Sequence, residues 1–353
     1  MRYSYNWLQS FFQDPLPEAN KLADLLTMHS FEVEEVGKEG DNYFLDIDIL
    51  PNRAHDCLSH FGLARECSVL LNQKIQNPTE KVDLPQIEGK QDLEVSIEEE
   101  SLCPRYVAYV VENIDIKESP EWLKERLGAM EQKSINNVVD ITNYIMWELG
   151  QPLHAFDFEK IKGGKMQIRT SEEGETLTTL DGTPHTFDGN TIIIEDAEKI
   201  IDLAGIKGGD NTQVDQDTKR VVFQAAIFDP ARIRQSMQKL GARTEASVRY
   251  MHGFDPNKSL GALNRTIEIL KDGGYRGGNW GHIHSIKLGG HIGHDRVAGF
   301  HLGANLLVGG EHHRVIFSGL FEVLGREQHR GAVGDEGLAD VPHAHAAARV
   351  ETR

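Results

Sequence analysis

Residues 134–157 read SINNVVDITNYIMWELGQPLHAFD, a mostly apolar segment that carries polar groups inside it. Its apolar positions are Val138, Val139, Ile141, Ile145, Trp147 and Leu149. Asp140, Thr142 and Asn143 lie among them, and His154 follows shortly after. Polar groups in such surroundings need hydrogen-bond partners or serve a function. The segment predicts a helix that ends at Gly150-Gln151-Pro152 and a loop that presents His154 beside Asn143.

The residues before this segment predict a compact α+β module, residues 1–75. Apolar residues at helical spacing predict a helix over residues 18–27, and the alternation FLDIDIL predicts a half-buried strand over residues 44–50. The turn PNRAHDC follows, and then an amphipathic helix from Leu58 to Leu71. The polar residues 76–92 are typical of a linker.

Residues 93–274 predict a second, larger domain of mixed strands and helices. The expected strands cover residues 105–111, 166–169, 191–195 and 220–223, with a hairpin turn at Asp181-Gly182. Helices are expected to begin at Ser119-Pro120 and Asp229-Pro230, where a capping residue precedes proline. The second helix should end at Leu240-Gly241, because glycine adopts the left-handed cap readily. The predicted fold class is therefore α+β.

The composition indicates a globular protein of more than one domain and excludes transmembrane and secreted classes. The 353 residues include 37 Lys and Arg against 55 Asp and Glu, a formal net charge of −18. No run approaches the roughly 20 apolar residues that a membrane span needs, and the N-terminus lacks a signal-peptide pattern. Three cysteines without CxxC spacing indicate neither a disulfide framework nor a zinc site, so we expect a reducing cytoplasm.

Residues 275–353 differ from the rest and are expected to form a degenerate or poorly ordered module. They contain 10 of the 16 His and 15 of the 34 Gly residues, and their charges balance. The histidines allow a metal site, but their spacings match no ligand pattern, so a poorly folding or miscopied stretch, such as a shifted reading frame, is the favoured interpretation. The echo between residues 31–33 and 321–323, both Phe-Glu-Val, leaves open a repeat of the N-terminal fold.

Two further clusters carry unusual residue types. LAGIKGGDNTQV, residues 203–214, has Gly205, Gly208 and Gly209, which allow close approach of the backbone to a ligand but lack nucleotide-loop spacings. GARTEASVRY, residues 241–250, mixes small and hydroxyl residues just beyond a helix end. These segments indicate no Ser/His/Asp or Cys/His nucleophilic arrangement.

Several motifs resemble the tRNA-editing domain of the beta subunit of bacterial phenylalanyl-tRNA synthetase. The similar runs are DITNYIMWELGQPLHAFD, CPRYVAYVV, GETLTTLDG, DLAGIKGG and TEASVRYMHGFDP, and PNRAHDCLSHFGLARE resembles the subunit's N-terminal module. The resemblance covers residues 1–274, in the family's order. It implies a C-terminally shortened beta subunit of a cytoplasmic phenylalanine-tRNA ligase. The family works as a heterotetramer with an alpha subunit, which carries aminoacylation, and the complete synthetase uses ATP and magnesium.

The resemblance also implies roles for seven residues in the hydrolysis of mischarged tyrosyl-tRNA(Phe). The implied catalytic residues are His154, Asn143 and Thr142, and the implied pocket residues are Gly208, Gln224, Thr244 and Ala246. His154 would lie near the ester and the terminal ribose, and Gly208 would leave room for the ligand. The attacking group would be a water held by polar groups and the substrate's ribose hydroxyl, with no covalent nucleophile. No cofactor is expected to bind this segment.

The sequence departs from the family's pattern in three places. Gln224 replaces a glutamate that receives the tyrosine hydroxyl, which removes a charge-assisted bond. The oligonucleotide-binding barrel that many family members insert after Val36 is absent, and Ala347 aligns with an acidic magnesium ligand, so no metal ligand is carried over. Two alternatives therefore stay open: a non-catalytic scaffold for the alpha subunit, and a free-standing protein that binds or edits aminoacyl-tRNA. The acidity of residues 1–274 predicts weak tRNA binding by the chain alone.

Overall fold

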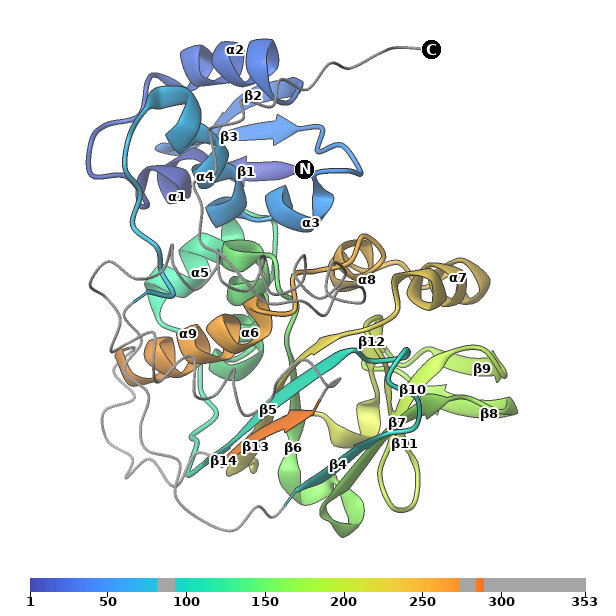
Figure 1. The fold of residues 1–353 in the computed structure, drawn as a ribbon. Coiled ribbons are helices and arrows are strands. Elements are labelled where there is room, and N and C mark those ends of the chain that lie inside the picture. Colours follow the sequence, from blue (N-terminus) through green and yellow to red (C-terminus); the bar gives the residue numbers. More distant parts are fainter. Residues whose placement is uncertain (81–92, 273–283, 289–353) are drawn as a thin grey trace, which may run out of the picture. The chain divides into compact units, whose positions relative to one another are not determined.

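The structure is a computed structural model that describes residues 1–80, 93–272 and 284–288 (Figure 1). Contacts divide the chain into units of residues 1–290 and 291–353, and the second unit lies outside the described residues. The first unit mixes helices with several sheets, which confirms the α+β class. The side chains of the histidines considered as metal ligands, and the echo at residues 321–323, lie outside the described part.

The N-terminal residues form a three-stranded antiparallel sheet and four helices. The strands are β1 (Arg2–Ser4), β2 (Val33–Glu39) and β3 (Asn42–Ile47), in the order β1-β3-β2. The helices are α1 (Tyr5–Gln9), α2 (Ala19–His29), α3 (Ala54–Cys57) and α4 (His60–Leu71). The predicted helix and strand correspond to α2 and β3, but β2 was not predicted. Helix α4 begins two residues later than expected because the Ser59 hydroxyl accepts from the Gly62 amide and caps it.

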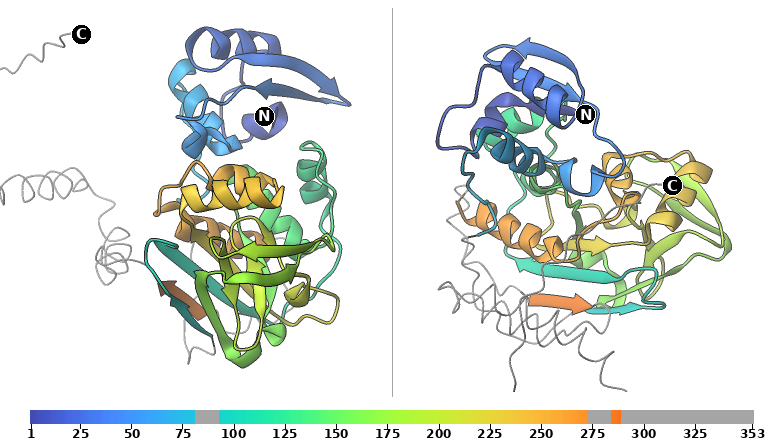
Figure 2. Two further views of the ribbon diagram at one scale, coloured as in Figure 1. Left: turned by 90° about the vertical axis from the view of Figure 1, so that its right-hand side faces the viewer. Right: turned by 45° about the horizontal axis from the view of Figure 1, so that its top comes forward.

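The strands of the remaining described residues form two larger sheets and a hairpin (Figures 1 and 2). The first sheet has the order β14-β5-β13-β6, from β5 (Arg105–Glu112), β6 (His154–Asp157), β13 (Arg220–Ile227) and β14 (His284–Leu288). The second has the order β12-β11-β10-β7-β4, from β4 (Glu94–Ile97), β7 (Lys165–Thr170), β10 (Ile192–Glu195), β11 (Ile200–Leu203) and β12 (Lys207–Gly208). The hairpin of β8 (Glu173–Thr178) and β9 (Pro184–Asp188) contains the predicted turn.

The helices of this part are α5 (Glu121–Gly128), α6 (Asn137–Leu149), α7 (Pro230–Leu240), α8 (Glu245–Tyr250) and α9 (Lys258–Asp272). Short 3₁₀ turns lie at η1 (Phe158–Lys160), η2 (Lys162–Gly164) and η3 (Asp210–Thr212). Helix α7 begins and ends where predicted: Asp229 caps it and Gly241 ends it at φ +60°. The prediction that Ser119 caps α5 is wrong, because its hydroxyl donates to Asp140 and Pro120 takes the cap position.

Strand β5 is buried on both faces and separates two hydrophobic cores. Val107 and Tyr109 belong to a core shared with the N-terminal helices, α6 and α9, whereas Tyr106 and Ala108 belong to a core that joins the two larger sheets. Side chains alternate between faces along a strand. The neighbouring strand β13 follows the same alternation, so Gln224 faces the core between the two sheets.

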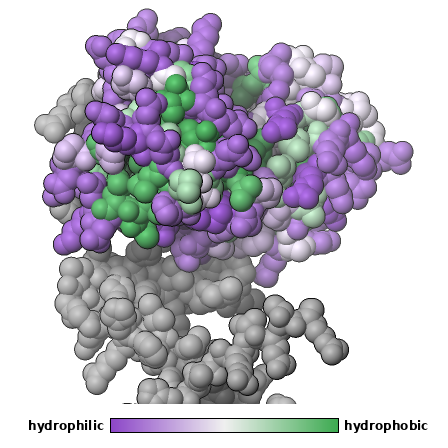
Figure 3. All heavy atoms as spheres, turned by 90° about the horizontal axis from the view of Figure 1, so that it is seen from above, coloured by the Kyte–Doolittle hydropathy of each residue, from purple (hydrophilic) through white to green (hydrophobic). Residues whose placement is uncertain are grey.

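The face seen from above is largely hydrophilic, with hydrophobic residues gathered toward its middle (Figure 3). Some exposed hydrophobic surface is ordinary for folded proteins. Among the helices described, none is long and apolar enough to span a membrane.

Candidate functional site

A half-open pocket of about 50 Å³ lies where β6, β13, β11, β12 and α8 meet. Its lining residues are Pro152, Leu153, His154, Asp202, Gly205, Ile206, Lys207, Gly208, Gln224, Ala246 and Tyr250. Four of the seven residues predicted for the site are among them: His154, Gly208, Gln224 and Ala246. Residues separated by up to 98 positions in the sequence, Pro152 and Tyr250, therefore share one pocket.

His154 is the first residue of β6, so the prediction that it lies on a loop is wrong. Helix α6 does end at Gly150, in the left-handed conformation at φ +84°, as predicted. After Pro152 the chain pairs with β13, and His154 lies directly opposite Gln224 in the antiparallel ladder. Directly opposite residues project to the same face of a sheet. The ladder, rather than a loop, brings these two side chains to the pocket.

Gly208 supplies the space that the His154 ring occupies. A Cβ atom built on Gly208 would lie 2.6 Å from the His154 Nε2 atom and 3.1 Å from a Leu180 methyl group. Both distances are too short for ordinary packing, so residue 208 must lack a side chain for the imidazole to keep this position. The absence of a side chain at Gly208 therefore makes room for the His154 ring itself, in addition to any room for a ligand.

The His154 imidazole is neutral near pH 7 and has free hydrogen-bonding capacity. Burial lowers its pKa to about 4, because the charged form loses water without gaining a partner. The ring packs edge-on against Phe156, with centroids 4.4 Å apart. Neither ring nitrogen has a hydrogen-bond partner among the described residues. A neutral imidazole can donate through one nitrogen and accept through the other, so it can bind a polar group of a ligand.

Gln224 is buried, and its amide oxygen already has a partner. The Tyr106 hydroxyl donates to Gln224 Oε1 at 2.9 Å, and this hydroxyl also approaches the Met166 sulfur at 3.7 Å. Gln224 exposes only 2% of its surface. The Gln224 side chain is thus part of the pocket wall, and its hydrogen bond to Tyr106 fixes its orientation.

Thr244 and Ala246 lie at the start of α8. Thr244 caps this helix in a reciprocal arrangement with Ser247, and its hydroxyl also donates to the Ile206 carbonyl at 2.9 Å. That bond ties α8 to the loop before Gly208. Thr244 does not line the pocket, but its bond to Ile206 fixes the part of the wall that α8 and Ile206 form. Ala246 lines the pocket itself.

Thr142 and Asn143 do not line the pocket. They lie in the middle of α6, and the Thr142 hydroxyl donates to the Val139 carbonyl of its own helix at 2.7 Å. Such local bonds are common for threonine in helices. Neither of them lines the pocket that contains His154. Of the three predicted catalytic residues, only His154 therefore lies in this pocket.

Sequence reasoning missed Asp202, which lines the pocket from β11 with 3% of its surface exposed. Burial raises the pKa of its carboxyl group well above the usual value. A charged residue within the apolar strand IIDL was the available signal. Tyr250 also lines the pocket, and its hydroxyl donates to the Pro152 carbonyl at 3.3 Å.

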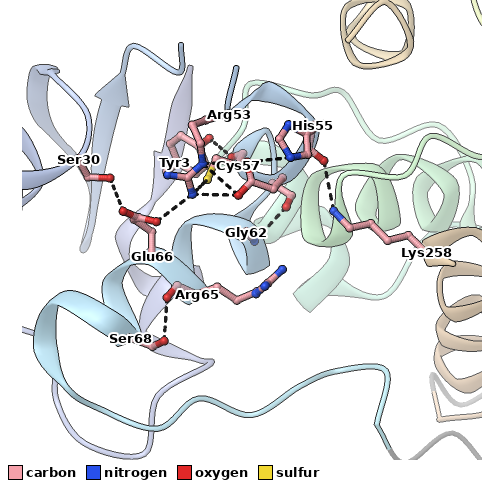
Figure 4. Close-up of polar contacts among 12 residues, drawn as sticks. Tyr3, Ser30, Arg53, His55, Cys57, Gly62, Arg65, Glu66, Ser68 and Lys258 are labelled. Carbon is pink, nitrogen blue, oxygen red and sulfur yellow. Dashed lines mark hydrogen bonds and ion pairs between the residues drawn. The ribbon is translucent and has the colours of Figure 1, made fainter. Parts of the chain in front are cut away.

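The PNRAHDC motif has a structural role (Figure 4). Arg53 forms ion pairs with both Asp56 and Glu66 at 2.9 Å, and Ser30 donates to Glu66. The Lys258 ammonium of α9 donates to the His55 carbonyl at 3.2 Å. These contacts join the turn to α4 and to the larger domain.

A larger cavity, about 190 Å³, lies beside the PNRAHDC motif and is lined by Phe61, Arg65 and Lys258 among others. No residue predicted for the site lines it. Within the described part of the chain, no group of three or more His, Cys, Asp or Glu residues is arranged to hold a metal ion.

Comparison with known proteins places this geometry in a family context. Residues 102–274 match the model of the B3/4 domain family. The chain is 43% identical over 235 residues to a phenylalanine–tRNA ligase beta subunit of Clostridium acetobutylicum, covering 66% of this chain and 29% of the relative. It is 39% identical over 252 residues to that of Carboxydothermus hydrogenoformans, covering 71% and 31%. The chain thus spans less than a third of the length of these relatives.

A crystal structure of an N-terminal fragment of the phenylalanyl-tRNA synthetase beta subunit from Pyrococcus horikoshii is also similar. It shares 17% sequence identity with this chain at a TM-score of 0.36, covering 69% of this chain and 74% of the fragment.

Proposed function

Because the chain belongs to the family of phenylalanine–tRNA ligase beta subunits, we propose that its pocket hydrolyses mischarged tyrosyl-tRNA(Phe). In this proposal the chain works with an alpha subunit, which charges tRNA(Phe) with phenylalanine using ATP and magnesium. The editing step is needed because a site for phenylalanine cannot reject by size alone a ring that only adds a hydroxyl group. The chemistry of this chain is then ester hydrolysis at the end of the tRNA.

The observation that carries the proposal is the unpaired, neutral imidazole of His154 inside a pocket built around it. Gly208 makes room for the ring, and Gln224 lies opposite it on the neighbouring strand. The ring is partly buried and its nitrogens have no protein partner, so both are free to bind a polar group of a ligand. The amino-acid end of an aminoacyl-tRNA offers an amine, an ester and a ribose hydroxyl that would satisfy the ring.

His154 is suited to orient the reacting groups rather than to carry a proton through the reaction. A base with a pKa of about 4 takes up a proton poorly at neutral pH, because efficient general bases have pKa values near the working pH. As a neutral donor and acceptor, the ring would hold the attacking water or the ribose hydroxyl against the ester carbonyl. Correct placement alone contributes substantially to rate. The oxyanion would be stabilised by donors in or near the pocket wall.

The test is a deacylation assay with tyrosyl-tRNA(Phe) labelled on the amino acid. We expect the purified chain, alone or with an alpha subunit, to exceed the spontaneous rate of hydrolysis. His154→Ala should lower the rate about a hundredfold, in the range of a single positioned catalytic group. His55→Ala is the matched control, because His55 is half exposed in the N-terminal module, and it should keep full activity. A wild-type rate that never exceeds the spontaneous one would contradict the proposal.

A non-catalytic scaffold for the alpha subunit is the second candidate. Gln224 favours it, since the amide carries no charge and its oxygen is already bound to Tyr106. Under this hypothesis the pocket is a remnant and the fold serves assembly. Co-purification with an alpha subunit in the absence of any deacylase activity would support the scaffold. Deacylase activity in a chain that does not co-purify with an alpha subunit would instead favour a free-standing editing protein.

A further inference from the structure

The pocket contains a buried carboxyl group that has no partner in the protein. Asp202 lies on β11, opposite Ile194 of β10 on one side and Gly208 of β12 on the other, and only 3% of its surface is exposed. Its carboxyl group makes no hydrogen bond or ion pair with any described residue, and burial alone accounts for its altered acidity. Asp202 lines the same pocket as His154 and Gln224.

The nearest candidate partners of Asp202 are committed elsewhere. Tyr106 and Tyr250 are close enough to interact with it electrostatically, but their hydroxyl groups donate to Gln224 Oε1 and to the Pro152 carbonyl. The Lys207 ammonium, which also lines the pocket, is paired with Asp181 at 2.6 Å. No cation of the pocket therefore neutralises the carboxyl group.

A carboxyl group in such a place is stable chiefly in its neutral form. Removing a carboxylate from water without a counter-charge costs several kcal/mol, so the pKa rises until the proton is retained. Burial raises the pKa of Asp202 well above its usual value. A neutral carboxylic acid donates through its hydroxyl and accepts through its carbonyl. It can therefore match a ligand hydroxyl group, which has the same two capacities.

Gln224 offers a ligand chiefly a hydrogen-bond donor at this wall. One lone pair of its Oε1 atom already accepts from Tyr106, whereas its NH₂ group is free to donate to a ligand. A phenol hydroxyl placed here has its own proton to donate, and the unpartnered Asp202 carbonyl is a buried acceptor that can take it. An unsubstituted phenyl ring would leave the Asp202 carboxyl group unsatisfied.

We propose that Asp202 determines the specificity of the pocket by hydrogen-bonding the para-hydroxyl group of a tyrosyl ligand. This inference rests on the proposed function, because that function supplies the tyrosyl group. Asp202 thereby provides the polar contact that the neutral Gln224 side chain does not. The pocket selects a hydroxylated ring because only such a ring satisfies the buried acid, and sites of this kind discriminate more strongly than apolar ones.

The experiment measures binding and hydrolysis separately on the full chain. The binding probes are non-hydrolysable amides, 3′-tyrosylamino-3′-deoxyadenosine and its phenylalanyl counterpart, titrated by calorimetry. The hydrolysis substrates are tyrosyl- and phenylalanyl-tRNA(Phe). We expect the wild type to bind the tyrosyl probe about tenfold more tightly, Asp202→Ala to abolish that preference, and Asp202→Asn to retain most of it. Asparagine keeps the shape and offers both a donor and an acceptor.

Asp196→Asn is the matched control, because Asp196 is also a buried carboxyl group but lies in the turn between β10 and β11 and does not line the pocket. It should keep the tyrosyl preference. A preference that persists in Asp202→Ala, or a wild type without any preference, overturns the inference whether or not hydrolysis occurs. If the wild type shows an Asp202-dependent preference yet hydrolyses neither ester, the inference stands and the proposed hydrolysis fails.

Discussion

Two histidines, the fully buried His60 and the partly buried His154, show opposite relationships with their surroundings. Burial lowers the pKa of His60 to about 3 and that of His154 to about 4. The Ser4 amide donates to His60 Nε2 at 3.0 Å, and His60 Nδ1 lies 3.0 Å from the Trp147 carbonyl, so the proton is on Nδ1. Trp7 stacks on this ring at 4.0 Å. His154 has no comparable partners.

The difference teaches that a depressed pKa does not by itself identify a functional histidine. Both rings lose water, and both are neutral near pH 7. Both ring nitrogens of His60 form hydrogen bonds that join β1 to the end of α6, so neither nitrogen can bind a ligand. His154 keeps both nitrogens free at the edge of a pocket. The number of protein partners, not the acidity, separates the structural residue from the candidate functional one.

Replacing His60 with alanine should give the largest effect. The change removes two buried hydrogen bonds and the stacking on Trp7, and it leaves a cavity. We expect the free energy of unfolding to fall by about 3 kcal/mol, as for other large buried rings. Chemical denaturation followed by circular dichroism measures this. His154→Ala is the comparison, and its unfolding free energy should change by less than about 1 kcal/mol. Similar losses for both variants would contradict the contrast.

The second-largest expected effect is the contribution of His60 to the pH dependence of the free energy of unfolding. The folded-state pKa of His60 lies below the unfolded value of about 6.5, so the unfolded state binds the proton more readily between these values. The stabilisation is therefore complete above pH 6.5 and is lost as the pH falls. Between pH 7 and pH 5 His60 should account for a loss of about 2 kcal/mol. His60→Ala should show a shallower dependence in the same denaturation series, and an unchanged slope would refute the assignment.

Gly208→Ala tests whether the position of the His154 ring depends on the absence of a side chain at residue 208. The new methyl group would lie within van der Waals overlap of the His154 imidazole and would displace it. We expect the rate of tyrosyl-tRNA(Phe) hydrolysis to fall about tenfold, because misplacing a positioning group weakens catalysis. Gly128→Ala is the matched control, since a Cβ there meets nothing within 4 Å. Equal rates in the two variants would show that the ring's position is unimportant.

Gln224→Glu should have the smallest effect. A carboxylate opposite His154 would accept more strongly than the amide, so the rate of tyrosyl ester hydrolysis should rise a few-fold. The measurement is the deacylation rate of the variant relative to the wild type. If activity appears only in the variant, the wild-type chain is better explained as a scaffold. A lowered rate would indicate that the Tyr106–Gln224 bond matters more than the charge.

The elements that could be predicted from the sequence are those whose signals are local. The limits of α7 follow from Asp229, Pro230 and Gly241, which act within one turn of the helix. Where a distant group competes, the local signal fails: the Ser119 hydroxyl bonds Asp140 instead of capping α5. His154 was expected on a loop because its strand exists only through pairing with β13.

The site shows the same division between local and long-range information. The motifs around His154, Gly208 and Ala246 identified a shared pocket through their resemblance to one family, and the structure places these residues together. The same resemblance grouped Thr142 and Asn143 with His154, whereas in the structure these two lie in the middle of α6 and line no part of that pocket. The sequence alone predicts no site role for Asp202, because its neighbours are apolar strand residues. Its place in the pocket appears only when β11 packs beside the strands that carry Gly208 and Gln224.

The sequence alone determined the α+β class, the local helix limits, the acidity of residues 1–274 and the resemblance to an editing domain. Only the tertiary structure decided which polar groups are satisfied. His60 finds its partners on β1 and α6, whereas His154 and Asp202 find none. The physical reason is that hydrogen bonding of a buried group depends on segments that are far apart in the chain and meet only when the sheets and helices pack.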